Sequence, residues 1–364
     1  MNFKKSVNHF RRTIMRRLTG GIGDGNLPKI DKEKPLELNR VLINRPNQRL
    51  GNILLITPLI QEIIRYNPGV KIDLFVKGKV APIIFENYPQ VDQIIELPKK
   101  PFKELIQYAK VWLKIKKKNY DLVINVDKNS SSGRLSTSFA NSKYKIFGNE
   151  FEMNSNQEIH IHQAQYPVYL FRKFIELFKN KEGNLDIPTL NIQLTEKESL
   201  KGVEMLNELI QDPSKRTLAF FTYATGVKCY DEEWWIEFYN LFYPKYSQEY
   251  NLIEILPVEN ISMLNHRLPT YYSKDVREIA AVMKSCEFVI AADSGMMHLS
   301  CAAPTKTIGL FKDQSFLERY KPYGVGNAVV LINNEDKGIL VQEMDKLLFK
   351  KPFLLLNKIC IDLI

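Results

Sequence analysis

The sequence is poor in cysteine, with 4 among 364 residues and no CxxC pair. Cysteines so few and so widely spaced argue against a disulfide framework and favour a reducing compartment. Long apolar runs are also missing, because Lys358 and Asp362 interrupt the longest candidate, 353–364, and a membrane-spanning helix needs roughly 18 apolar residues. No apolar region follows the basic N-terminus, so we expect no secretory signal. These absences favour a globular protein of the cytoplasm.

Acidic residues are absent from the first 20 positions, which hold six Lys and Arg residues. This segment therefore contributes +6 to a formal net charge of +10, and the remaining chain contributes only +4. Positive charge confined to one end argues against a nucleic-acid-binding body and indicates an attached basic segment.

The basic segment has apolar residues at helical spacing, namely Phe3, Val7, Phe10, Ile14 and Leu18. An amphipathic helix of this kind is able to lie on an anionic membrane surface. Alternatives are an additional helix packed on the body and a frayed tail. We predict that residues 1–39 are an N-terminal extension and linker. The membrane alternative, with residues 1–20 as the contact, places the protein on the inner face of the cytoplasmic membrane.

From residue 40 onward, short apolar segments alternate with amphipathic ones, which predicts an α/β fold with parallel sheets. Strands are expected at 41–44, 71–76, 93–97, 121–126, 143–147, 217–221, 252–256, 288–292 and 307–310, with helices at 53–66, 80–87, 102–117, 163–179, 232–242, 275–283 and 296–302. A polar stretch near 180–188 separates the two halves. We therefore predict Rossmann-like domains at 40–188 and 189–325, and a helical segment at 326–364 whose residues 340–349 return to the first domain.

In open parallel sheets, ligands bind beyond the carboxyl ends of the strands. The first such loop, 44–52, offers Gly51 for a tight turn against a ligand, Asn52 as a helix N-cap, and Arg45 and Arg49 for an anion. The alternative is an ordinary strand-to-helix loop.

The second loop, 222–228, combines two hydroxyls, a glycine and a lysine. Thr222, Thr225 and Lys228 together suit a phosphate, with Lys228 supplying the charge. The alternative is a solvated loop.

The third loop gives the strongest indication. The strand 288–292 runs into Asp293-Ser294-Gly295 and then into a helix that contains His298. Free N–H groups and the dipole of the first helical turn form an anion site, and Asp293 or Ser294 is placed to cap it. A lone histidine is more often structural, but this loop favours a functional one.

These loops, in this order, resemble glycosyltransferase family 9, the ADP-heptose:lipopolysaccharide heptosyltransferases. The most specific motif of the family, Asp-[Ser/Thr]-Gly-x-x-His, stands here as Asp293-Ser294-Gly295-Met296-Met297-His298. Further matches are 41–45, Gly51-Asn52, Thr57-Pro58, 68–74, 120–124, 302–305 and 320–324. The resemblance covers about residues 40–325.

The resemblance implies a GT-B architecture, with two facing Rossmann-like doubly wound domains. It implies an inverting transfer from a nucleotide-sugar to a lipid-linked glycan, without an essential metal or other cofactor. The first domain would hold the acceptor and the second the donor. By motif position, Lys228 would contact the diphosphate, Glu259 would reach ribose hydroxyls, and Asp293, Ser294, Gly295 and His298 would line the donor pocket.

One position departs from the family. Where the family carries the aspartate proposed as general base, this chain has Asn52, and an amide does not accept a proton at neutral pH. Either Asp127 replaces it, or water or the acceptor's own phosphate takes the proton, or transfer activity is lost. The last alternative is a nucleotide-sugar- or glycan-binding protein. Another alternative is a transferase of the same fold that uses a UDP- or GDP-sugar.

His160 and His162 have strand spacing that places both rings on one face. Two ligands are too few for a closed metal site, so we expect no metal.

Overall fold

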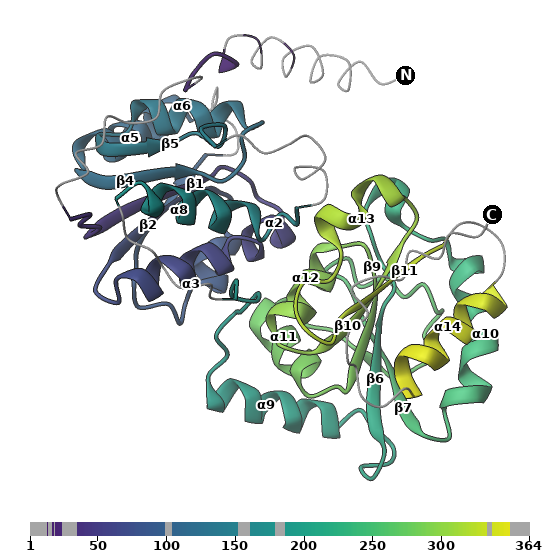
Figure 1. Ribbon diagram of the computed structural model, residues 1–364. Helices are drawn as coiled ribbons and strands as arrows, with labels where there is room; N and C mark the ends of the chain where they lie inside the picture. Colours follow the sequence, from purple (N-terminus) through teal and green to yellow (C-terminus); the bar gives the residue numbers. More distant parts are fainter. Residues whose placement is uncertain are drawn as a thin grey trace. The chain divides into compact units, whose positions relative to one another are not determined.

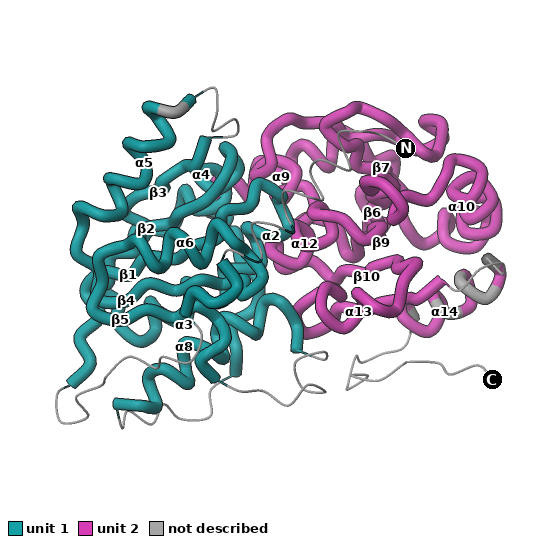
Figure 2. The backbone as a smooth tube through the Cα atoms, turned by 90° about the horizontal axis from the view of Figure 1, so that it is seen from above, with its two compact units in different colours: residues 1–195 teal, residues 196–364 magenta. Residues whose placement is uncertain are grey.

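The computed structural model describes residues 13, 17, 19–23, 35–98, 104–151, 161–178, 186–332 and 337–349. Two compact units divide the chain, Met1–Thr195 and Glu196–Ile364 (Figure 2). The division falls after the predicted position at 188. The reason is that Gln61 donates to the carbonyl of Thr189 at 2.8 Å and Tyr88 donates to that of Asn191 at 2.8 Å, which ties this segment to unit 1. The amphipathic helix predicted at 3–18 lies almost entirely outside the described residues.

Unit 1 contains a five-stranded parallel sheet in the order β3-β2-β1-β4-β5. Its elements are β1 (Arg40–Arg45), α2 (Leu50–Leu54), α3 (Thr57–Tyr66), β2 (Lys71–Lys77), α4 (Val80–Ile84), β3 (Val91–Leu97), α5 (Leu105–Lys117), β4 (Tyr120–Asn125), α6 (Ser131–Phe139), β5 (Ser142–Ile146) and α8 (Tyr166–Glu176). Helices α5 and α6 cover one face of the sheet, and α3 and α8 cover the other (Figure 1). Since both faces are covered, β4 is buried along its whole length.

Unit 2 contains a six-stranded parallel sheet in the order β11-β10-β9-β6-β7-β8. Its elements are α9 (Glu196–Asn207), β6 (Arg216–Phe221), the short 3₁₀ helix η1 (Gly226–Lys228), α10 (Glu232–Tyr246), β7 (Tyr250–Ile255), β8 (Thr270–Tyr271), α11 (Val276–Lys284), β9 (Phe288–Ala292), α12 (Gly295–Ala302), β10 (Lys306–Phe311), α13 (Gln314–Tyr320), β11 (Ala328–Leu331) and α14 (Lys337–Phe349). Helices α10 and α14 lie on one face, and α11 and α12 on the other (Figure 1). Each predicted strand is present in one of the two sheets, within a few residues of its expected ends.

The prediction for the C-terminal segment is wrong in two respects. Residues 328–331 form strand β11, which pairs with β10, rather than a helix. The following helix, α14, packs on α10 and belongs to unit 2 rather than to unit 1. Val341, Met344 and Leu348 recur at helical spacing and complete the aromatic core around α10, and the Tyr246 hydroxyl donates to the Asp345 carboxylate.

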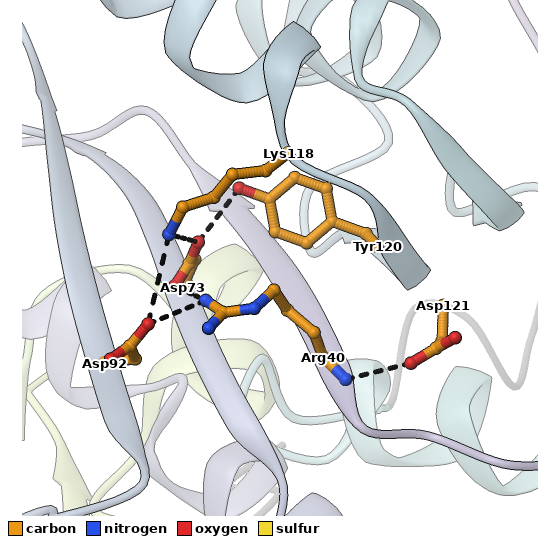
Figure 3. Close-up of polar contacts among 6 residues, drawn as sticks. All are labelled: Arg40, Asp73, Asp92, Lys118, Tyr120 and Asp121. Atoms are coloured by element: carbon orange, nitrogen blue, oxygen red, sulfur yellow. Dashed lines mark hydrogen bonds and ion pairs between the residues drawn. The ribbon is translucent and has the colours of Figure 1, made fainter.

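A buried ion cluster lies at the amino ends of the strands of unit 1 (Figure 3). The Asp73 carboxylate, which is fully buried, accepts hydrogen bonds from Arg40 at 2.9 Å, from Lys118 at 2.7 Å and from the hydroxyl of Tyr120 at 2.9 Å. Asp92, at the edge of the cluster, accepts a second hydrogen bond from Arg40 at 2.7 Å. The cluster is therefore absent from the carboxyl ends of the strands, where ligands bind in this fold class.

Helices α9 and α11 of unit 2 approach closely at Gly202. A Cβ added at this position would lie 2.4 Å from the carbonyl oxygen of Ala281. We expect Gly202→Ala to lower the free energy of unfolding by about 1–3 kcal/mol through overpacking, although alanine favours a helix by about 1 kcal/mol over glycine. Thermal unfolding measures the effect, with Leu200→Ala on the exposed side of α9 as the control. Equal stability of Gly202→Ala and wild type would show that α9 is not held against α11.

Candidate functional site

The sheet of unit 2 changes direction between β6 and β9, which are neighbours in space although β7 and β8 follow β6 in sequence. A ligand crevice forms at such a switch point, beyond the carboxyl ends of the two strands. Lys228 lies in η1 after β6, and Asp293 follows β9 directly. The Lys228 ammonium and the Asp293 carboxylate form an ion pair of 2.5 Å across the switch point. The structure thus brings together two residues predicted from separate loops.

Helix α12 begins at the same point. Ser294 is its N-cap and accepts a hydrogen bond from the backbone N–H of Met297 at 3.4 Å. Of the two predicted caps, Ser294 is therefore the correct one, which leaves Asp293 to pair with Lys228. Gly295 is the first helical residue, and His298 lies one turn further on with 4% of its surface exposed. The remaining N–H groups of the first turn provide the anion-binding end of the helix.

Two aromatic rings lie near the lysine of this ion pair, and a buried tyrosine follows it closely in sequence. The rings of Phe316 and Tyr320, both from α13, lie 5.9 Å from the Lys228 ammonium. Tyr230 is buried, and its hydroxyl has no hydrogen-bond partner among the described residues. Burial, together with the charge of Asp293, raises the pKa of Tyr230. The phenol therefore stays protonated and is able to donate a hydrogen bond.

Lys312, at the carboxyl end of the sheet of unit 2, was not among the predicted site residues. It follows β10 directly, its ammonium donates to the carbonyl of Cys229 at 2.7 Å, and it lies 4.3 Å from the centre of the Tyr230 ring. The detectable signal was its position, because it is the first residue beyond a parallel strand, where ligands bind.

The other predicted donor residues have different surroundings. Thr222 is fully buried and donates to the Glu254 carboxylate at 2.7 Å, so its hydroxyl faces the core and not the loop surface. Thr225 is exposed at the start of η1, and Glu259 is exposed on the turn after β7. Binding roles for these three residues remain predictions.

The sheet of unit 1 has its own switch point, between β1 and β4. Arg45 ends β1, and its guanidinium forms an ion pair of 2.7 Å with Asp127, which lies just beyond β4. The second carboxylate oxygen of Asp127 accepts the backbone N–H of Asn129 at 3.1 Å. Asp127 is therefore a positioned carboxylate, and its role as a base remains a prediction.

Two expectations for the loop after β1 are wrong. Helix α2 begins at Leu50, so Asn52 lies inside the helix and does not cap it, and Gly51 is a buried helical residue rather than part of a tight turn. The cause is Asn47, whose side chain accepts the backbone N–H of Arg49 at 2.9 Å and ends the loop earlier. The side chain of Arg49 is exposed at the start of the helix.

Metal ligands do not gather in the described part of the chain, where no group of three or more His, Cys, Asp or Glu side chains has a suitable arrangement. His160 lies outside the described residues, and the Nδ1 atom of His162 accepts the backbone N–H of Ala164 at 3.1 Å. Among the described helices, none combines the length and the apolar character needed to cross a membrane.

Comparisons with known proteins agree with these features. Residues 274–348 match the family model of glycosyltransferase family 9 (heptosyltransferase), and this range contains Asp293, Ser294, Gly295, His298 and Lys312. Lipopolysaccharide heptosyltransferase 1 of Campylobacter coli is 23% identical over 300 residues, which are 72% of this chain and 81% of that protein.

Solved structures share the fold. A glycosyltransferase family 9 structure from Veillonella parvula has a TM-score of 0.64 at 16% identity and covers 88% of this chain and 93% of its own. The E. coli heptosyltransferase WaaC with ADP has a TM-score of 0.58 at 17% identity, with coverage of 85% and 99%. E. coli ADP-heptose lps heptosyltransferase II has a TM-score of 0.61 at 14% identity, with coverage of 85% and 98%. The predicted fold class, a GT-B architecture with two Rossmann-like doubly wound domains, is confirmed.

Proposed function

We propose that this chain is a family 9 glycosyltransferase, supported by the match to the family model over residues 274–348 and by the Campylobacter coli relative. In this proposal it transfers a heptose or a similar sugar from a nucleotide-sugar to a lipid-linked glycan such as the lipopolysaccharide core. The observation that carries the proposal is the Lys228–Asp293 ion pair beside the N-terminus of α12. The donor proposed is ADP-heptose-like, supported by the solved structures of E. coli WaaC with ADP and with ADP-2-deoxy-2-fluoro heptose.

In the proposed reaction, an acceptor hydroxyl attacks the anomeric carbon and the bond from that carbon to the diphosphate oxygen breaks. Negative charge then grows on the nucleoside diphosphate that leaves. Groups that stabilise developing charge lower the barrier most when they are already in position. We assign the stabilisation of this charge to Lys228 and to the N–H groups at the start of α12. Ser294 would hold the first turn of that helix, and His298 would line the pocket.

The remaining donor contacts are proposed for Thr225, which is exposed beside η1, and for Glu259, which would reach the ribose hydroxyls. Thr222 would support the donor site without contacting the donor, because its hydroxyl donates to Glu254 and fixes the start of the loop after β6.

Unit 1 is assigned the acceptor, with Arg45 and Arg49 as candidate contacts for its phosphate groups. Because Asn52 cannot take the proton of the acceptor hydroxyl, Asp127 is the proposed base. No metal or other cofactor enters the proposal. Residues 1–20 are proposed to hold the enzyme on the inner face of the cytoplasmic membrane through anionic lipids, where a lipid-linked acceptor would be at hand.

Asn52 also favours a second candidate function, a binding protein that holds a nucleotide-sugar or glycan without transfer. General-base help contributes about 10²–10⁴ in rate, so an enzyme without the family's aspartate would be slow or silent.

One experiment separates these candidates. Calorimetry with ADP, UDP, GDP and ADP-heptose is followed by a nucleotide-release assay with a lipid-glycan extract. We expect tighter binding of the ADP species and release that depends on the extract, with release lowered by about 10²-fold in Asp127→Asn. Binding without release, unrescued by Asn52→Asp, would favour the binding protein. Preference for UDP or GDP would refute the ADP-heptose donor.

A further inference from the structure

The charge at the switch point of unit 2 poses a problem for an anionic ligand. Asp293, with 10% of its side chain exposed, neutralises Lys228 at 2.5 Å. The pair as a whole therefore carries no net charge toward a diphosphate. A nucleotide-sugar brings a doubly anionic diphosphate, and the dipole of a short helix offers only about half a unit charge. A further cation is needed close by.

Lys312 meets this need. Among the described residues, no carboxylate lies within ion-pair distance of its ammonium, which donates instead to the carbonyl of Cys229 at 2.7 Å. The carboxylate nearest in sequence, Asp313, accepts hydrogen bonds from the backbone and hydroxyl of Ser315 at the start of α13 and also lies within electrostatic reach of Lys228. Lys312 is therefore not neutralised by an ion pair with a described carboxylate, in contrast to Lys228.

Lys312 lies at the same end of the sheet as Lys228. Strands β10, β9 and β6 are adjacent in the sheet, so the residues that follow them meet at one edge. Lys312 comes from the first strand, Asp293 from the second and Lys228 from the third. The ammonium of Lys312 bonds to Cys229, the residue after Lys228, and lies 4.3 Å from the centre of the Tyr230 ring. The Lys312 ammonium is thus hydrogen-bonded to the residue next to Lys228 in sequence.

The buried hydroxyl of Tyr230 provides a second, independent indication of a ligand. This hydroxyl donates to no described residue, although buried polar groups are nearly always hydrogen-bonded. The phenol lies next to the Lys312 ammonium and within the electrostatic reach of Asp293. An anion bound between the two lysines would offer acceptor oxygens at this point.

We propose that Lys312 is the second cationic contact for the diphosphate of the donor and supplies the net positive charge that the neutralised Lys228–Asp293 pair lacks. This inference rests on the proposed function, because it names a specificity residue of the same donor site. It assigns to Lys312 a preference for ligands with a diphosphate over those with a single phosphate.

Lys306 offers a control on the same strand, although its ammonium, unlike that of Lys312, pairs with Glu287 at 2.8 Å. Lys306 begins β10 and Lys312 follows its end, and each ammonium lies over an aromatic ring, that of Phe288 at 5.0 Å and that of Tyr230 at 4.3 Å. Lys306→Met and Lys312→Met remove the same charge and leave the same side chain, at opposite edges of the sheet. Only the second edge carries the proposed site.

The test is calorimetric titration of the full chain with ADP and AMP at low and at moderate salt. We expect Lys312→Met to weaken ADP binding about tenfold and AMP binding less, with a shallower salt dependence than wild type. Lys306→Met should stay within about twofold of wild type, and Lys312→Arg should recover most of the affinity. Circular dichroism of all variants checks that each is folded.

Wild-type ADP affinity in folded Lys312→Met would overturn the inference and leave the proposed function standing. Equal losses in Lys312→Met and Lys306→Met would also overturn it, since net charge alone would then explain the effect. Failure of the wild type to bind ADP, UDP or GDP would remove the proposed function and the inference together.

Discussion

Lys228→Met should lower kcat/KM for the nucleotide-sugar by about 10²–10³-fold, the loss typical when a preorganised charge is removed from the leaving group. The variant loses a cation, and it also leaves the Asp293 carboxylate without its partner, at 10% exposure of its side chain. An unpaired carboxylate then faces the negative diphosphate. Nucleotide-release kinetics measure the effect, with KM and kcat determined separately.

A double variant distinguishes the two parts of this loss. In Lys228→Met combined with Asp293→Asn, the repulsive carboxylate is gone, so we expect kcat/KM to lie several-fold above that of Lys228→Met alone. Lys215→Met, just before the amino end of β6, is the control and should match wild type. A double variant that is worse than Lys228→Met would mean that Asp293 contacts the donor directly and does more than position Lys228.

Asp73→Asn should have the largest effect on stability, a loss of about 3 kcal/mol in the free energy of unfolding. Removing one partner of a buried ion pair leaves the other charges uncompensated, at a cost of about 3–5 kcal/mol. Here the lower end applies, because 23% of each side chain, Arg40 and Lys118, is exposed to water. Hydrogen–deuterium exchange of peptides from β1 and β2, combined with urea unfolding, assigns the loss to unit 1.

Asp92→Asn is the matched control, since Asp92 shares both cations but has 34% of its side chain exposed. We expect it to cost at most about 1 kcal/mol. The hydrogen bond from Arg40, together with the charges of Arg40 and Lys118, lowers the pKa of Asp92. Its stabilisation is therefore present above about pH 4 and is lost as the pH falls through the lowered pKa. If Asp73→Asn were no more harmful than Asp92→Asn, burial of Asp73 would not add to what the cluster contributes to stability.

The sequence predicted the strands well because parallel strands covered on both faces are short, continuous apolar runs. Strand β9 (Phe288–Ala292) has the predicted bounds, and β4 is displaced by one residue. Helices α9 and α13 were missed because many of their residues are polar and solvent-exposed. Strand β8 is only two residues long, and α14 has a weak apolar stripe whose partner, α10, cannot be read from local spacing.

The sequence predicted the individual motifs of the candidate site but not the contacts between residues that follow different strands. Asp293-Ser294-Gly295 is a local signal, because a strand end, a cap and a helix start are contiguous in sequence. The ion pair from Lys228 to Asp293 depends on β6 and β9 being neighbours, which only the strand order reveals. For the same reason, the contact between Lys312 and Cys229 had no counterpart in any sequence pattern.

Helix α14 has a consequence for how the chain folds during synthesis. The core around α10 includes Val341, Met344 and Leu348, which leave the ribosome after every other described element of unit 2. Unit 1, in contrast, is complete once the segment up to Thr195 has emerged. Leu348 follows the end of α10, Tyr246, by 348 − 246 = 102 residues. At about 5–20 residues per second, the aromatic face of α10 would therefore wait roughly 5–20 s for its cover. The nascent chain therefore exposes this aromatic surface in the second half of translation, when a ribosome-associated chaperone would be able to protect it.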